Sequence, residues 1–364
     1  MYTTLVGLPL SEIDTPALLI DLDALEHNIR TMASDIKSRG ADWRPHSKAN
    51  KTPQIVHMEI AAGAIGVTCA KLGEAEVMAA NGIKDILISN QVVGKIKTRR
   101  IAALVRHVDV KSAVDSRDNV IELNAAGAEI GSKPRVVIEV NTGMERCGVA
   151  PGEATLDLAR FIVDQPNLEF AGLMTWEGHS LGIKDPAERE KEIKRACGSL
   201  VETAELLRAN GIPVGIVSAG GTGTYLTSAG VEGITEVEAG GGIFGDSSYI
   251  DLGANVKPAL SVMTHVTSRP SRDKVVIDSG RKTIDPSNRQ PTVVGLEIDG
   301  PIAFSAEHGK FTLKAPSDTP KVADRLFLQS GYSDQLCHLH EYFIGVRNGV
   351  VEAVWPILGR GKLQ

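Results

Sequence analysis

The sequence predicts a (β/α)8 barrel of the TIM type followed by an antiparallel β domain. Short apolar runs alternate with helix-like stretches through the first two thirds of the chain, which is typical of βα units around a parallel sheet. From about Pro258 onward, similar runs are separated by short turns without a long helix. That change of pattern is typical of an antiparallel β domain.

Nine apolar runs in the first part have the length of buried strands, one more than a barrel needs. They are Ala17–Asp21, Trp43–Ser47, Val67–Cys69, Ile86–Ser89, Val108–Ser112, Arg135–Val140, Phe170–Thr175, Val214–Ser218 and Glu236–Ala239. Helical stretches between them include Leu22–Ser38, Glu74–Ala80, Glu153–Val163 and Pro186–Ala209. The surplus N-terminal strand could join the β domain.

The β domain is predicted from seven strand-like runs. They are Ser261–Val266, Lys274–Asp278, Thr292–Leu296, Gly309–Leu313, Arg325–Gln329, Glu341–Arg347 and Gly349–Trp355. We therefore expect an N-terminal segment 1–22 with a strand that joins the β domain, a barrel over residues 23–255 and the β domain over residues 256–364.

Composition excludes several classes of protein. The chain has 364 residues, of which 42% are hydrophobic and 23% charged, as in globular proteins and unlike disordered or fibrous ones. The formal net charge is −6 without a basic block, so neither a nucleic acid nor an anionic membrane is expected as a partner. No apolar run approaches the ~20 residues of a membrane span. Four cysteines without CxxC spacing predict reduced thiols and a cytoplasmic location.

Polar or glycine-rich loops follow five of the predicted barrel strands, where barrel enzymes carry their functional groups. These loops contain Lys48, Arg146, Trp176, Gly220–Thr224 and Gly240–Gly241. The glycine loop at 220–224 suits a phosphate, because glycines allow close approach and consecutive N–H groups can hold an anion at a helix start. A flexible turn is the alternative interpretation.

Lys48 would ordinarily be a surface lysine, but a lysine facing a phosphate loop could form a Schiff base with pyridoxal phosphate. Arg146 could pair with an anionic oxygen of the cofactor or form a structural salt bridge. His46 could contact the cofactor or pack within its strand. Lys51 is expected to be solvated.

The segment Arg44–Lys51, RPHSKANK, resembles the RPHxKxxK signature of the D-threonine aldolase and D-serine dehydratase family. These are fold-type III pyridoxal-phosphate enzymes, related to alanine racemase. Further matches extend from residue 14 to residue 362, among them the glycine loop, Arg146–Val149 and Glu307–Gly309. The signature and the loop together are specific for the cofactor and fold, and less so for the reaction.

The resemblance implies that Lys48 carries pyridoxal phosphate and that Arg146 contacts the phenolic oxygen of its ring. Trp176, where the family has a tyrosine, and His46 complete the implied catalytic set. The resemblance also implies a homodimer whose active sites draw on both chains. The implied cofactor-binding residues are Lys48, Arg146, Thr175, Ser218, Gly220, Gly221, Thr222, Gly223, Thr224, Gly240 and Gly241.

The family's metal pair, His-x-Asp in aldolases and His-x-Cys in dehydratases, is altered. Tyr332 stands at the position of the histidine and Asp334 at that of its partner. A divalent ion (Mn, Zn or Mg) could be held by Asp334 with His338 and His340, which share a face if this stretch is extended. Cys337 is a further candidate ligand. The interpretation of the two histidines as polar residues at the start of a strand is favoured over ligation, and the site could be free of metal.

The resemblance implies a lyase acting on a small-molecule D-amino acid. The aspartate at 334 favours an aldolase that cleaves D-3-hydroxy amino acids of the D-threonine type to glycine and an aldehyde. A dehydratase of D-serine or 3-hydroxy-D-aspartate is the alternative. A non-catalytic pyridoxal-phosphate binder is a third, although such barrel-only relatives lack the second domain expected here.

Overall fold

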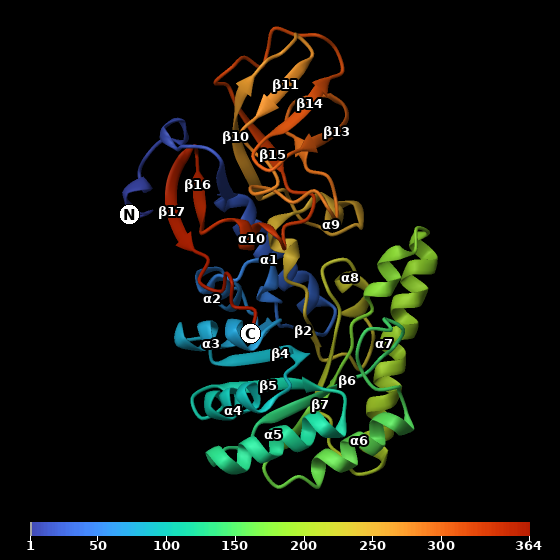
Figure 1. The fold of residues 1–364 in the computed structure, drawn as a ribbon. Coiled ribbons are helices and arrows are strands. Elements are labelled where there is room, and N and C mark those ends of the chain that lie inside the picture. The colour runs from blue at the N-terminus through green and yellow to red at the C-terminus, as the bar shows by residue number, and fades with distance from the viewer. Residues whose placement is uncertain (1) are drawn as a thin grey trace. The chain divides into compact units, whose positions relative to one another are not determined.

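The computed structural model describes residues 2–364, which fold into two units (Figure 1). One unit comprises residues 33–48, 53–240 and 361–364, and the other comprises residues up to 32, 49–52 and 241–360. The segment boundaries predicted after residues 22 and 255 stay predictions. The strands of the first unit are β2 (Asp42–Trp43), β3 (Val67–Cys69), β4 (Asp85–Gln91), β5 (Asp109–Val114), β6 (Arg135–Glu139), β7 (Glu169–Met174), β8 (Ile216–Ala219) and β9 (Glu236–Val237).

These eight strands form one parallel sheet in the order β2-β9-β8-β7-β6-β5-β4-β3. The two edge strands meet where His46 and Thr68 form an isolated parallel bridge. There the Thr68 N–H donates to the Pro45 carbonyl at 2.9 Å. The sheet thus curls round into a barrel, and the predicted fold class is confirmed.

Two predicted strands of the barrel are at least two residues longer than the observed ones, as is the predicted Thr292–Leu296 against β12 in the second unit. The run Trp43–Ser47 was expected to be extended throughout, but β2 ends at Trp43 and residues Ser47–Ala49 form a 3-10 turn, η3. Pro45 has no N–H to donate to a ladder, which is a physical reason for the early end. The run Glu236–Ala239 likewise contributes only its first two residues to β9.

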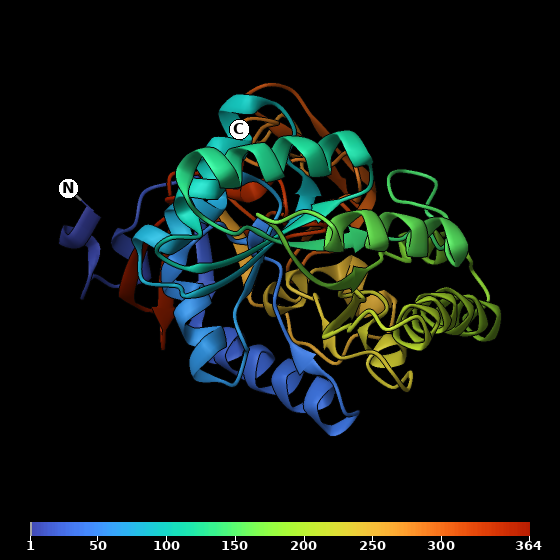
Figure 2. The same cartoon turned by 90° about the horizontal axis from the view of Figure 1, so that it is seen from below.

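Helices follow the strands and cover the outer face of the sheet (Figure 2). Their ends follow from the sequence: Ser116 caps α5 by accepting the Asn119 N–H, and Gly131 ends it in the left-handed region at φ 69°. Asp185 caps α7 by accepting backbone N–H groups with its side chain, and Pro186 is the first residue of that helix. The helices are α1 (Leu22–Ser38), α2 (Pro53–Ala61), α3 (Leu72–Ala80), α4 (Lys95–Leu104), α5 (Arg117–Ile130), α6 (Glu153–Val163), α7 (Pro186–Ala209) and α8 (Tyr225–Ser228).

The second unit is mainly antiparallel. Its first strand, β1 (Ala17–Asp21), pairs antiparallel with β10 (Leu260–Ser268) and parallel with β16 (Tyr342–Arg347), as expected for the surplus N-terminal strand. The strand β13 (Ile298–Phe304) was missed, because Gly300 and Pro301 interrupt its apolar pattern. The other elements are β11 (Lys274–Ile277), β12 (Thr292–Val293), β14 (Gly309–Leu313), β15 (Arg325–Gln329), β17 (Val350–Pro356), α9 (Ser247–Asp251) and α10 (Leu336–Leu339).

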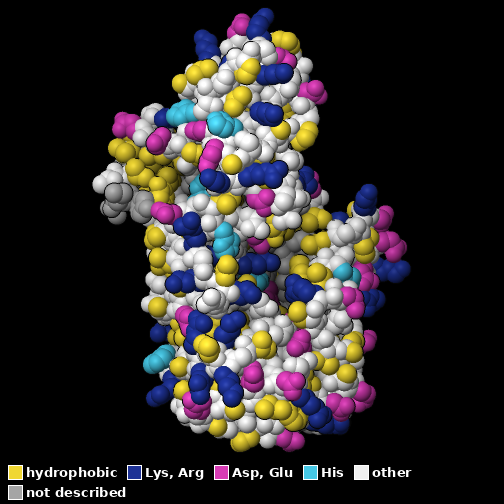
Figure 3. All heavy atoms as spheres, in the orientation of Figure 1, with side chains coloured by type: hydrophobic (Ala, Val, Ile, Leu, Met, Phe, Trp, Pro, Cys, Tyr) yellow, Lys and Arg dark blue, Asp and Glu magenta, His cyan; other side chains and the backbone are white. Residues whose placement is uncertain are grey.

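Each unit has its own apolar core. In the barrel, Leu87, Ala113 and Val137 from successive strands pack together with Ala171 and Met174. Such strands are apolar throughout because both faces of a parallel sheet are covered. No helix among residues 2–364 is both long enough and apolar enough to cross a membrane. On the face shown in Figure 3, basic and acidic side chains are interspersed rather than segregated.

Candidate active site

The sheet order brings the predicted loops together. The five strands that precede the candidate loops, β2, β9, β8, β7 and β6, are consecutive neighbours in the sheet. Because they are parallel, the loops that follow them lie at the same end of the barrel. These loops carry, in sheet order, Lys48, Gly240, Gly220–Thr224, Trp176 and Arg146.

Direct contacts link these loops. A Cβ built on Gly240 would lie 2.2 Å from the carbonyl oxygen of His46, so only glycine fits where the loops after β2 and β9 meet. The hydroxyls of Thr142 and Thr175 are 2.8 Å apart and join the loops after β6 and β7. The loops after β2 and β9, and those after β6 and β7, are therefore packed against each other.

Lys48 is exposed on η3. Its backbone N–H donates to Nδ1 of His46 at 3.3 Å, which places the ring proton of His46 on Nε2. Nε2 in turn lies 3.3 Å from the hydroxyl of Ser89 on β4. His46 thus braces the turn that carries Lys48.

The expectation that Lys51 is solvated is wrong, because only 3% of this residue is exposed. Its backbone is in the left-handed region at φ 50°. Its carbonyl accepts the N–H of Gly359 at 2.9 Å, so Lys51 belongs to the packed part of the second unit.

The glycine loop packs against Trp176 and Glu177, which follow β7. A Cβ on Gly221 would lie 2.4 Å from Cζ3 of the Trp176 indole. The hydroxyl of Thr224 donates to Glu177 at 2.5 Å and accepts the Gly221 N–H at 3.0 Å. The helix that follows, α8, has only four residues, so the expected contribution of a helix start to anion binding is small.

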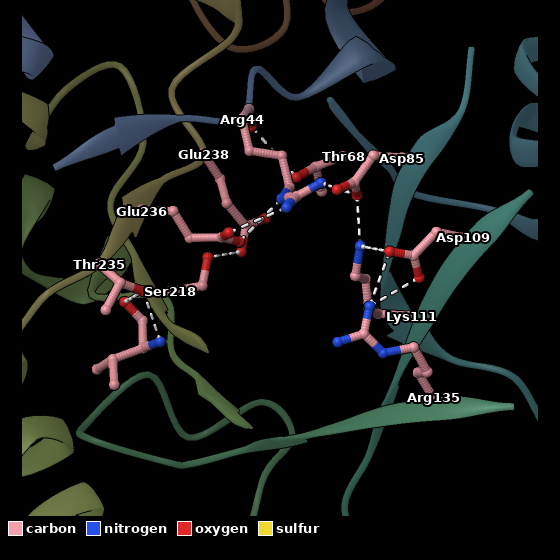
Figure 4. Close-up of polar contacts among 11 residues, drawn as sticks. Arg44, Thr68, Asp85, Asp109, Lys111, Arg135, Ser218, Thr235, Glu236 and Glu238 are labelled. Carbon is pink, nitrogen blue, oxygen red and sulfur yellow. Dashed lines mark hydrogen bonds and ion pairs between the residues drawn. The ribbon is translucent and has the colours of Figure 1, made fainter. Parts of the chain in front are cut away.

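Two other predicted cofactor contacts have their hydroxyls inside the barrel. Thr175 donates to the carbonyl of Val140 at 2.8 Å. Ser218 donates to the carboxyl group of Glu238 at 2.8 Å (Figure 4). Burial raises the pKa of Glu238 to about 8, so this carboxyl is mostly protonated at neutral pH. The roles of Thr175 and Ser218 toward a cofactor stay predictions.

Arg146 is half exposed, and its Nη2 atom lies 3.5 Å from the buried carboxylate of Glu139. Glu139 also accepts a hydrogen bond from the side chain of Gln91 at 2.5 Å. Burial, with Glu139 nearby, raises the pKa of the adjacent Cys147 thiol. Arg146 therefore has the structural ion pair that was its alternative role, and its guanidinium still reaches solvent.

The predicted metal residues all lie in the second unit. Asp334 accepts the hydroxyl of Tyr332 at 2.7 Å, and Nε2 of His340 lies 2.8 Å from the carbonyl of Thr283. The extended conformation that would put His338 and His340 on one face is wrong, because residues 336–339 form α10. Within residues 2–364, no three His, Cys, Asp or Glu side chains are grouped so that they could hold a metal ion.

Sequence reasoning assigned no role to three buried acids, Glu177, Glu238 and Asp246. Each is at most 7% exposed. Asp246 accepts both the N–H and the hydroxyl of Ser333 at 2.7 Å, and burial raises its pKa to about 7. The sequence signal that could have found them is an acidic residue within an apolar or glycine-rich run. Burying such a side chain costs free energy unless it is hydrogen-bonded, so its position points to specific partners.

Arg44, from the signature segment, supports the barrel rather than the candidate loops. It is 2% exposed and pairs with Glu236 at 2.9 Å and with Asp85 (Figure 4). Lys111 continues this network by binding Asp85 and Asp109 at 2.5 and 2.7 Å. Asp85, Asp109 and Glu236 are the first residues of their strands, so the network lies toward the amino end of the barrel.

Comparisons with known proteins agree with this architecture. The family model "Alanine racemase, N-terminal domain" matches residues 20–248, and "Putative serine dehydratase domain" matches residues 259–346. The chain is 35% identical to 3-hydroxy-D-aspartate aldolase from Paracoccus denitrificans (strain Pd 1222), over 98% of this chain and 95% of that one.

Solved structures are similar over their whole length. D-threonine aldolase from Filomicrobium marinum has a TM-score of 0.93 and 34% identity, with 99% of each chain covered. D-threo-3-hydroxyaspartate dehydratase from Delftia sp. HT23 has a TM-score of 0.84 and 27% identity, with 96% of this chain and 98% of that one covered. The chain therefore belongs to the alanine racemase N-terminal domain family, as a two-domain member related to aldolases and dehydratases of D-3-hydroxy amino acids.

Proposed function

We propose that this protein is a pyridoxal-phosphate-dependent aldolase that cleaves D-3-hydroxy amino acids of the D-threonine type to glycine and an aldehyde. One observation carries the proposal: five adjacent strand ends bring Lys48, the glycine loop, Trp176 and Arg146 to one end of the barrel. The full-length similarity to two kinds of aldolase supports the choice of reaction.

The residues at these strand ends fit the cofactor. Lys48 is an exposed residue, and Gly221 and Gly240 are positions where a Cβ would collide with Trp176 and His46, so the loops can pack this closely only with glycine. In the proposal, Lys48 binds the aldehyde carbon through Nζ and Arg146 faces the phenolic oxygen. The backbone of Thr222 and Gly223 holds the phosphate, next to the Gly221 N–H that Thr224 accepts. The bound cofactor supplies an electron sink for the charge left at Cα when the Cα–Cβ bond breaks.

The chain's own residues orient this site. His46 accepts the Lys48 N–H and is held near Ser89, so it fixes the turn on which the amine is mounted. Trp176 covers Gly221 with its ring and offers a single N–H donor. A tyrosine hydroxyl could also accept a hydrogen bond, so the surroundings of the cofactor differ at this position.

The divalent metal expected from the family does not fit the residues present. Asp334 already accepts the Tyr332 hydroxyl, and burial raises the pKa of that phenol, so Tyr332 stays neutral and is a poor ligand. The ring of His340 faces the Thr283 carbonyl. We therefore propose a reaction in which no step depends on a metal at Asp334.

The dehydratase reaction is the second candidate, supported by the similarity to the Delftia enzyme. Product analysis separates the two. The purified protein is incubated with pyridoxal phosphate and D-threonine, with and without Mn²⁺ or Zn²⁺, and L-threonine serves as the control. Glycine with acetaldehyde supports the aldolase. Ammonia with 2-oxobutyrate supports the dehydratase and contradicts the proposal.

Binding without turnover would point to the third candidate, a non-catalytic binder. That outcome would be a stable cofactor spectrum that does not respond to any D-amino acid. The predicted homodimer and the predicted cytoplasmic location stay predictions.

A further inference from the structure

The carboxylate of Glu177 joins two of the loops at the candidate site. Glu177 is fully buried (0% exposed) and directly follows Trp176 after β7. Its Oε1 atom accepts the hydroxyls of Thr224 at 2.5 Å and Ser228 at 2.7 Å, and its Oε2 atom accepts the N–H of Gly220 at 3.2 Å. All three donors belong to the loop after β8 or to α8.

These bonds fix the hydrogen-bond directions within the glycine loop. Because the single hydroxyl proton of Thr224 is donated to Glu177, its oxygen is left to accept the N–H of Gly221 at 3.0 Å. The Gly221 carbonyl then accepts the backbone N–H groups of Thr224 and Tyr225 at 3.0 and 2.9 Å. One buried carboxylate is therefore bonded to the start of the turn at Gly220 and to its end at Thr224.

Glu177 cannot serve the phosphate by touching it. Its oxygens already accept three hydrogen bonds from the protein, and the group offers no donor to a phosphate oxygen. Its three donors give both carboxyl oxygens a hydrogen-bond partner, which is the condition for keeping a polar group at complete burial. Glu177 can therefore affect a bound anion only through the conformation of the loop to which it is bonded.

We propose that Glu177 is a positioning residue for the phosphate group of the cofactor, acting by holding residues 220–224 in their anion-binding shape. This inference rests on the proposed function, because it assumes that pyridoxal phosphate binds at this loop. It adds a residue to which neither the family signature nor the glycine pattern assigns a role.

The test compares binding of two probes, pyridoxal 5′-phosphate and pyridoxal, which differ only in the phosphate. Glu177→Gln keeps one oxygen for the two hydroxyls but places an NH2 group against the Gly220 N–H, so donor meets donor. We expect the Kd for pyridoxal phosphate to rise at least about tenfold. The Kd for pyridoxal should change less than about twofold, since the contact at Lys48 is untouched.

Glu59→Gln is the matched control. Glu59 is also a fully buried glutamate, on α2, and burial alone raises its pKa well above the usual range. Because neither carboxyl oxygen of Glu59 has a hydrogen-bond partner among the described residues, its amide should leave both Kd values unchanged. Ser228→Ala is a second variant, which removes one of the three donors to Glu177 at a residue outside the predicted cofactor-binding set. It should give a smaller phosphate-selective loss even if Glu177→Gln fails to fold.

Several outcomes overturn the inference. An equal loss of both probes would show that Glu177 merely stabilises the fold, and an unchanged Kd for pyridoxal phosphate would show that the loop does not need it. If the unmodified protein binds neither probe, the proposed function itself fails. If it binds both probes equally, the cofactor assignment stands and the phosphate role of the loop, with Glu177, is wrong.

Discussion

The six-membered ring of Trp176 occupies the space in which a Cβ atom on Gly221 would lie. A Cβ at residue 221 would be 2.4 Å from Cζ3 and 2.5 Å from Cη2 of the indole, distances that real Cβ atoms do not reach. The same indole closes over Gly178, where a Cβ would lie 2.2 Å from Nε1. The observed position of the Trp176 indole therefore requires glycine at residues 178 and 221.

Gly221→Ala should displace the loop or the indole and raise the Kd for pyridoxal phosphate by about tenfold or more, because overpacking costs ~1–3 kcal/mol. The double variant Gly221→Ala/Trp176→Ala should regain most of the affinity, since it removes the ring that the new methyl group meets. Absorbance titration with the cofactor measures both. If the double variant binds no better than Gly221→Ala, the contact with Trp176 is not the cause.

Lys48→Ala should abolish the visible absorption band of the bound cofactor, because Nζ of Lys48 is the proposed point of attachment. Lys95→Ala, which removes an exposed lysine at the start of α4, is the control and should leave the band intact. A band that survives in Lys48→Ala would contradict the cofactor assignment.

Metal removal tests the altered pair Tyr332–Asp334. We expect treatment with EDTA to leave the lyase rate unchanged, and elemental analysis to find far less than one tightly bound divalent ion per chain. Tyr332→His frees Asp334 from its 2.7 Å hydrogen bond and introduces an imidazole, so this variant should bind Mn²⁺ more tightly than the unmodified protein. Stoichiometric metal in the unmodified protein would refute the expectation.

Much of the fold was predictable because buried strands are apolar runs in the sequence. The bounds predicted from these runs for β1 and for β3 to β8 lie within two residues of the observed ones. The candidate loops were predictable because chemistry in a barrel follows strand ends. Glu177 and Glu238 could not be given roles, because their partners lie 20 to 51 residues away in the chain. The burial of Lys51 was missed because it depends on packing with Gly359, which no local pattern reports.

Glu238 should make stability fall with rising pH. Its folded-state pKa is about 8, above the ordinary 4.5, so between these values the folded protein keeps a proton that the unfolded chain releases. Stability is lost progressively through that window. Glu238→Gln mimics the protonated acid and should raise Tm at pH 8–9 but not at pH 5. If the difference in Tm between Glu238→Gln and the unmodified protein is the same at every pH, the raised pKa of Glu238 is wrong.

Arg44 should contribute far more to the free energy of unfolding than Arg135, a partly exposed arginine that pairs with Asp109 of the same network. Its guanidinium is buried against Glu236, whose side chain is only 4% exposed, so Arg44→Met strands a buried carboxylate. Such a loss lowers the free energy of unfolding by about 3–5 kcal/mol. A shift of the denaturant midpoint measures it. Arg135→Ala removes ion pairs with Asp109 and Glu169 from a side chain that is 31% exposed, and each should be worth less than about 1 kcal/mol.

The double variant Arg44→Met/Glu236→Leu distinguishes the stranded charge from lost packing. If the cost of Arg44→Met comes from the unpaired carboxylate, removing Glu236 as well should restore most of the stability, since buried ion pairs are often replaceable by apolar residues. If the double variant is as unstable as Arg44→Met, the guanidinium acts mainly through Asp85 or by filling space (Figure 4). In either case the affinity for pyridoxal phosphate of the folded protein should change little, because the network lies toward the amino ends of the strands and the candidate loops follow their carboxyl ends.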